Sequence, residues 1–223
     1  MSWFQLDPPS LAARAQGTAA PSLAASLWRG ILGFTLVSIA GFLPWGVFGK
    51  WFRFPGGEVS MYLVCALVFL LLSGLLLQRL ILGKGSLSRF YKLFTPAFAA
   101  YSVAWIASWM LVGGHAGSIV GLLSGTAIMG WMFAAAFDAK GQALKMIAAL
   151  FVLNSFGYFV GGVIKVAILD MPELTIVGIT LAPHTQRTLA LMQWGVCYGL
   201  GLGAGLGVAF HLCQGKAREL LAK

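Results

Sequence analysis

The sequence predicts an all-α integral membrane protein: a six-transmembrane-helix bundle with both termini cytoplasmic. Of its 223 residues, 59% are hydrophobic and only 9% are charged, whereas a soluble domain carries about 25% charged residues. So few charges cannot cover a water-facing surface, and the apolar excess is therefore expected to face lipid. Six separate apolar segments are each long enough to cross a bilayer, which takes about 20 apolar residues.

The chain divides into a lead-in, a membrane domain and a tail. Residues 1–26 are expected to be a cytoplasmic lead-in with short interfacial helices, because Pro-Ser-Leu-Ala-Ala occurs at 9–13 and again at 21–25. In each copy the serine can cap a short helix that the alanines favour. Residues 27–213 form the membrane domain, and residues 214–223 a cytoplasmic tail. The predicted spans are 27–49, 60–82, 92–113, 116–137, 146–168 and 188–213.

Turn residues separate the predicted spans. The breaks include Pro55-Gly56-Gly57, Gly83-Lys84-Gly85-Ser86, Gly113-Gly114-His115 and Asp138-Ala139-Lys140-Gly141. The longest loop, 169–187, contains an apolar run over 175–180 that is too short to cross the membrane. We expect that run to form a small hairpin or an element lying against the end of the bundle.

Lysine and arginine set the predicted orientation. With the N-terminus inside, eleven of these 15 residues fall inside, and four fall outside: Lys50, Arg53, Lys165 and Arg187. Cytoplasmic loops carry such an excess of positive charge, and this distribution accounts for the net charge of +9 without a nucleic-acid partner. The expected location is the cytoplasmic (inner) membrane.

Charged and metal-binding side chains are missing from the predicted membrane interior. No Asp, Glu, Lys or Arg falls near the middle of a predicted span, which argues against a proton pump, a cation-coupled transporter or a voltage sensor. The three cysteines, Cys65, Cys197 and Cys213, form no paired motif. Neither a metal site nor a cofactor is predicted.

Neutral polar residues remain at depth, and three of them are candidate cavity-lining residues: Ser124, Asn154 and Tyr198. A rise of about 1.5 Å per residue places each of them between about 12 and 15 Å from the start of its span. Lipid offers such groups no partner, so each should face protein or a cavity. If they line one cavity, its uncharged wall suits a neutral ligand. If they bond to neighbouring helices, they hold the bundle together instead.

The sixth span carries a glycine pattern. Its spacing of four places Gly199, Gly203 and Gly207 on one face as candidate helix-packing residues, with Gly201 and Gly205 on a neighbouring face. Small residues at this spacing let helix backbones approach closely. We expect the sixth helix to lie at the centre of the bundle or at an oligomer seam.

Parts of two spans resemble rhomboid intramembrane proteases, which have six helices with both ends inside. The run Gly121-Leu122-Leu123-Ser124-Gly125 is similar to their Gly-x-Ser-Gly motif with one residue more. The glycine-rich sixth span is similar to theirs, but Tyr198 stands where they have histidine. Without an imidazole there is no general base for the serine, so the resemblance implies a non-catalytic member. We do not assign the chain to the family on this resemblance.

Three functions fit these observations, and an enzyme is the less favoured class. The first is a channel or facilitator for a small neutral solute. The second is a non-catalytic structural or assembly subunit of a membrane complex, with a homo-oligomer or a partner subunit in the membrane. The third is a rhomboid-like non-catalytic or lipid-binding membrane protein. The lipid bilayer is a partner in all three.

Overall fold

The computed structural model describes residues 4–49 and 57–222. These residues form helices apart from one small hairpin, and six of the helices are long and apolar enough to cross a membrane. The predicted fold class, an all-α membrane bundle with six spans, is confirmed. Lys50 and Arg53 from the charge count, and Pro55 and Gly56 from the first turn, lie outside the described residues.

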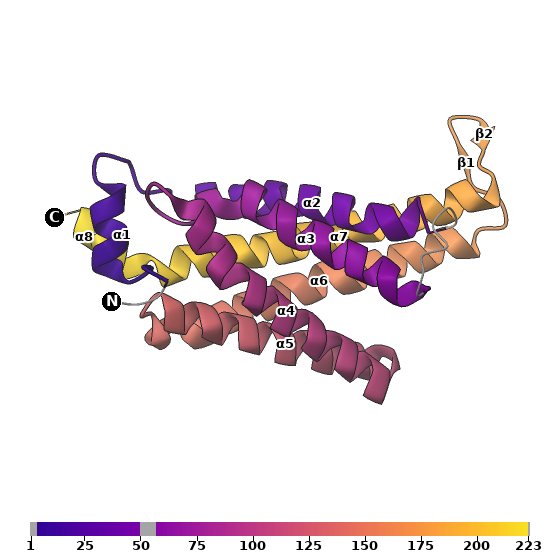
Figure 1. Cartoon of the computed structure of the whole chain (residues 1–223). Helices are drawn as coiled ribbons and strands as arrows, with labels where there is room; N and C mark the ends of the chain where they lie inside the picture. Colours follow the sequence, from indigo (N-terminus) through magenta and orange to yellow (C-terminus); the bar gives the residue numbers. More distant parts are fainter. Residues whose placement is uncertain (1–3, 50–56, 223) are drawn as a thin grey trace.

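The spanning helices are α2 (Leu23–Gly46), α3 (Glu58–Leu77), α4 (Ser86–Val112), α5 (Gly114–Ala136), α6 (Ala143–Asp170) and α7 (Pro183–Cys213). Short helices flank them, α1 (Pro8–Ala15) and α8 (Gly215–Leu221), with single turns at η1 (Gln78–Leu80) and η2 (Lys140–Gln142). Helices α1 and α8 lie side by side at one end of the bundle (Figure 1). We call this the terminal end, and the opposite one the far end.

The lead-in differs from the prediction. Asp7 caps α1, because its carboxylate accepts a hydrogen bond from the Ser10 amide at 3.1 Å. The prediction that Ser10 caps this helix is therefore wrong. Pro8 and Pro9 suit the first turn of a helix, so α1 begins before the serine. In the second copy, Ser22 does cap a helix, accepting from the Ala25 amide at 3.1 Å, but that helix is the spanning helix α2.

All six spanning helices begin before their predicted starts, and two of them do so by five or six residues. Helix α4 begins at Ser86 rather than near residue 92, directly after Gly85, whose φ of 69° is left-handed. Helix α7 begins at Pro183 rather than near residue 188, because proline fits the first helical turn. Turn residues mark these starts, whereas the first turns themselves are too polar for a hydropathy signal.

The long loop before α7 forms a small hairpin, which is one of the two structures expected for it. Strands β1 (Thr175–Ile176) and β2 (Ile179–Thr180) pair antiparallel, with Thr175 opposite Thr180. Val177 and Gly178 connect them with φ of 50° and 77°, as in the type I′ turns that favour tight hairpins. The hairpin stands off the far ends of α6 and α7 (Figure 1).

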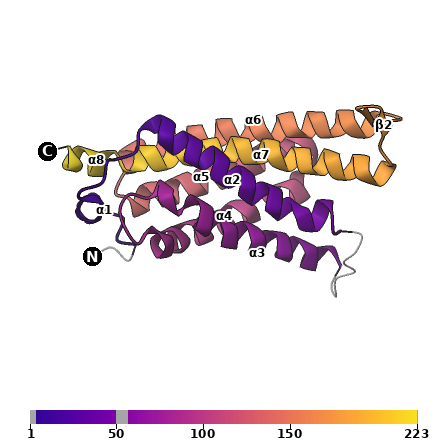
Figure 2. The ribbon, with the colours of Figure 1, turned by 90° about the horizontal axis from the view of Figure 1, so that it is seen from above.

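Helix α7 is the central helix. Of its most apolar window 56% is buried, against 17% for α4, and it packs along both α2 and α6 (Figure 2). The face of Gly199, Gly203 and Gly207 lies on α2: a Cβ on Gly203 would stand 2.5 Å from the Gly30 carbonyl oxygen. Gly201, on the neighbouring face, would meet Gly157 of α6 at 2.9 Å.

Helix α4 packs most closely on α5. There, a Cβ on Gly121 would stand 2.9 Å from the Trp105 Cα, and Gly117 and Gly125 approach α4 in the same way. Toward the rest of the bundle α4 presents a row of aromatic rings: Phe90, Phe94, Phe98 and Tyr101, all buried. In Figure 1 the pair α4–α5 diverges from α6–α7 toward the far end.

Candidate functional site

Three polar side chains from three helices meet inside the bundle. Asn154 of α6 is 0% exposed, and its amide nitrogen donates to the Tyr101 hydroxyl of α4 at 2.9 Å. The Tyr198 hydroxyl of α7 donates to the same oxygen at 3.3 Å. We call Tyr101, Asn154 and Tyr198 the interior polar cluster. It contains hydroxyl and amide groups and no charge.

Local packing explains why these side chains point inward. Asn154 shares its face of α6 with Leu150, Gly157 and Gly161, all buried. Gly157 and Gly161 let α7 approach α6 closely. The side-chain amide of Asn154, which lies between Leu150 and these glycines, is therefore also enclosed. Tyr101 extends the buried ring row of α4, with its ring 5.8 Å from that of Phe98.

Two polar atoms beside the cluster are buried without a hydrogen-bond partner in the described residues: Oδ1 of Asn154 and Nε1 of Trp105. Trp105 lies one turn beyond Tyr101 on α4, and Tyr158 lies one turn beyond Asn154 on α6. The rings of Trp105 and Tyr158 are 5.9 Å apart. An acceptor on α6 and a donor on α4 therefore each keep unused hydrogen-bonding capacity.

Ser124 is not part of the cluster. Its hydroxyl donates to carbonyl oxygens of its own helix, at 2.8 Å to Val120 and 3.2 Å to Gly121. The neighbouring Gly125, not Ser124, faces the Tyr101 ring. The structure brings Asn154 and Tyr198 together through Tyr101 and leaves Ser124 apart; a shared cavity lined by all three stays a prediction.

Tyr101 is the member that the sequence-based candidates omit. The signal was its spacing: positions 90, 94, 98 and 101 follow one helix face, and the first three are phenylalanines. A second interhelical contact at similar depth also escaped prediction, between the hydroxyls of Ser118 and Tyr158 at 3.2 Å. Both examples show a polar group whose partner is identified only once two helices are placed.

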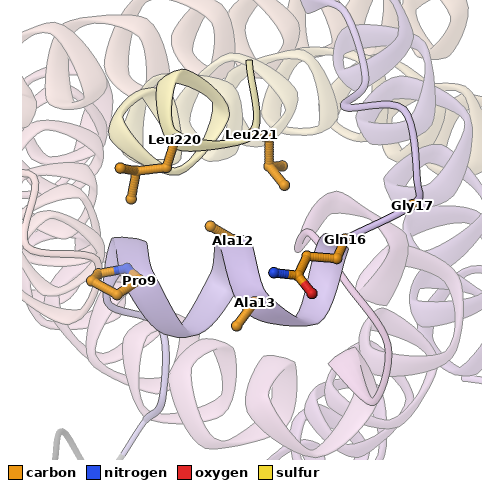
Figure 3. Close-up of a pocket in the computed structure, with 7 residues that line it drawn as sticks. All are labelled: Pro9, Ala12, Ala13, Gln16, Gly17, Leu220 and Leu221. Carbon is orange, nitrogen blue, oxygen red and sulfur yellow. The ribbon is translucent and has the colours of Figure 1, made fainter. Parts of the chain in front are cut away.

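The two cavities that stand out lie away from the interior polar cluster, at the terminal end. One, of about 440 Å³, opens between α1 and α8 and is lined mainly by small and apolar residues such as Ala12, Ala13 and Leu220 (Figure 3). The other, of about 190 Å³, lies between η2 and α8. No residue of the cluster lines either cavity.

Charged groups occupy the ends of the bundle. Lys216 and Asp138 form an exposed ion pair at 3.9 Å at the terminal end. Arg218 of α8 donates to the His211 carbonyl at 2.6 Å, and burial lowers the pKa of its guanidinium. A search of the described residues finds no group of three or more His, Cys, Asp or Glu that could hold a metal ion.

The chain matches no family model, no curated protein and no solved structure.

Proposed function

We propose that this multi-pass membrane protein is a non-catalytic structural or assembly subunit of a membrane complex. The observation that carries the proposal is how the interior polar groups are used. Asn154, Tyr101 and Tyr198 bond to one another across three helices, and Ser124 bonds to its own helix. These groups hold the bundle together, so the protein is expected to act through its surface.

The half of α4 nearer the far end is the surface that we assign to a partner. Before Val103 the helix buries one face, that of the aromatic rings. From Val103 onward it touches mainly α5, and Val103, Met110 and Leu111 are 67%, 72% and 86% exposed. Ala99 and Ala107 flank Val103 at a spacing of four on the exposed side. Short side chains at this spacing admit a second helix backbone more closely than leucine would, which favours a transmembrane helix of a partner protein.

Photocrosslinking in native membranes tests this surface. A crosslinking amino acid at Val103 or Ala107 should give one protein adduct of the same mass from both positions. Matched positions at Leu67 and Leu71 on the exposed face of α3 should give none. The adduct from Val103 should also disappear in the Ala107→Trp variant, because the large ring would keep the partner helix away from α4. Lipid adducts alone at all four positions, or equal protein adducts from α3, would contradict the proposal.

A second candidate function, passage of a small neutral solute, is favoured by the two unpartnered atoms beside the cluster. Oδ1 of Asn154 can accept and Nε1 of Trp105 can donate a hydrogen bond, so each atom offers a small neutral molecule a hydrogen-bonding partner. The swelling rate of proteoliposomes in glycerol or urea distinguishes the two candidate functions. A facilitator gives fast swelling that Asn154→Leu abolishes, whereas an assembly subunit swells no faster than protein-free liposomes.

We also propose that the terminal end faces the cytoplasm and that the membrane is the cytoplasmic (inner) membrane. The predicted excess of Lys and Arg at that end supports this orientation. In a variant without the three native cysteines, an impermeant thiol reagent added outside should label His115→Cys at the far end and spare Lys140→Cys. Both positions are exposed. The opposite labelling pattern would reverse the orientation.

A further inference from the structure

Several basic residues gather around the loop that joins α3 to α4 at the terminal end. Arg29 of α2 donates to the carbonyl oxygen of Arg79 at 3.2 Å, so α2 holds the single turn η1 that follows α3. The Lys84 amide reaches the carbonyl oxygen of Arg14 in α1 at 3.4 Å. One side-chain and one backbone hydrogen bond thus bring four cationic residues to one loop.

The same loop is fixed from the end of α7. The side chain of Gln214, which is buried, donates to the Leu80 carbonyl at 2.8 Å and accepts from the Leu82 amide at 2.7 Å. Because these contacts use backbone atoms, the loop keeps its position whatever side chains project from it. The side chains of Arg79 and Lys84 are exposed, and their carbonyl oxygens, not their charges, take part in the bonds that fix the loop.

A fifth cation lies behind the loop. Arg89 of α4 is 5% exposed, and its guanidinium donates to the carbonyl oxygens of Lys84 at 2.6 Å and Gly85 at 3.2 Å. Its remaining nitrogen, Nη1, is buried without a partner in the described residues. Arg14 acts on it electrostatically from nearby. We call Arg14, Arg29, Arg79, Lys84 and Arg89 the basic loop cluster.

The chain supplies little negative charge to this cluster. Of its six acidic residues, Glu58 at the start of α3, Asp170 and Glu173 belong to the far end. Asp138 and Glu219 lie with Lys216 around the second cavity. Asp7 precedes α1, where its carboxylate caps Ser10. Arg89 is buried, and Arg14, Arg29, Arg79 and Lys84 are exposed around the same loop. Like charges gathered in this way repel one another, so an external anion would lower the energy of the site.

We propose that the basic loop cluster binds the phosphate group of an anionic lipid. The cluster stands at the ends of α2, α3 and α4, the level at which lipid headgroups meet a spanning bundle. Arginine matches phosphate oxygens with paired donors. Beside Arg29, Trp28 is 60% exposed, and below Arg79, Leu75 is 56% exposed. A phosphate on the cations with acyl chains along these apolar side chains fits a lipid better than a free ion.

Native mass spectrometry with matched variants tests the site. Wild-type protein should retain phosphatidylglycerol and release phosphatidylcholine at the same concentration. The variant Arg79→Gln/Lys84→Gln should bind phosphatidylglycerol roughly 25-fold more weakly, since each basic residue near the surface contributes about fivefold. The control Lys140→Gln/Lys145→Gln removes the same charge from exposed residues at the same end and should weaken binding clearly less, because these lysines lie outside the basic loop cluster.

Each other outcome decides against the proposal. Equal retention of phosphatidylglycerol and phosphatidylcholine would show that the cluster does not select an anion. An equal loss in the control variant would reduce the effect to net charge. Inorganic phosphate that displaces phosphatidylglycerol at equal concentration would show that the acyl chains contribute nothing. The thermal midpoint of both variants in neutral detergent should match wild type, because the loop is fixed by backbone atoms.

Discussion

Helices α7 and α4 are joined to the bundle in opposite ways. Helix α7 meets α2 and α6 through glycines, so that backbone lies on backbone: a Cβ on Gly207 would stand 2.8 Å from the Leu27 Cα. Away from α5, α4 reaches its neighbours through rings, as where Phe90 stacks on Phe210 of α7 at 5.8 Å. A glycine contact has no side chain that can adjust, whereas rings between separated backbones can repack. The same bundle therefore contains one rigid seam and one adaptable seam.

The largest expected effect is on the glycine seam. Gly203→Leu places a side chain where the Gly30 backbone stands and should lower the free energy of unfolding by more than about 4 kcal/mol, in the exceptional class of substitutions. Reversible unfolding in mixed micelles measures it. The control, Gly162→Leu, adds the same side chain at a helical glycine with nothing within 4 Å and should be neutral or slightly stabilising. Equal losses in the two variants would remove the distinction.

On the aromatic seam, the expected cost comes from lost volume. Phe94 is 0% exposed, so Phe94→Ala should leave a cavity and cost about 3 kcal/mol in the same unfolding assay. Phe94→Met, which keeps most of the volume in a flexible side chain, should recover more than half of that loss. A Met variant as unstable as the Ala variant would mean that this seam does not repack.

A smaller effect is expected where the two seams are bridged. Tyr101→Phe removes the hydroxyl that accepts from both Asn154 and Tyr198 and should cost about 1 kcal/mol, the usual scale for hydrogen bonds between membrane helices. In the Asn154→Leu background the same change should cost less, because one partner is already gone. Strict additivity of the two substitutions would show that the two side chains do not act together.

The sequence predicts the number of spans well because each span is a local property of about 20 residues. Gly199, Gly203 and Gly207 follow one helical stripe in the sequence, and in the structure that stripe lies on α2. Hydropathy misplaces the starts at Ser86 and Pro183, where short polar stretches are helical without being apolar.

The interior polar cluster shows where a single sequence stops being informative. Depth along a helix predicts that Asn154 and Tyr198 need partners, but not which ones. Ser124 has equal depth, yet it turns to its own helix, as serine hydroxyls readily do. Tyr101 was hidden by the phenylalanines around it, because the stripe looked wholly apolar. Pairing across helices depends on rotation and separation, which hydropathy does not encode.

One comparison tests the central claim most directly: Gly203→Ala against Phe94→Leu in a single unfolding assay. The first adds one methyl group and improves helix propensity; the second replaces a buried ring. We predict that Gly203→Ala is the more destabilising of the two, because its methyl group would stand 3.0 Å from the Ile31 Cα, while neighbouring rings can close around leucine. If Gly203→Ala is as stable as wild type while Phe94→Leu unfolds the protein, the assignment of rigid and adaptable seams is contradicted.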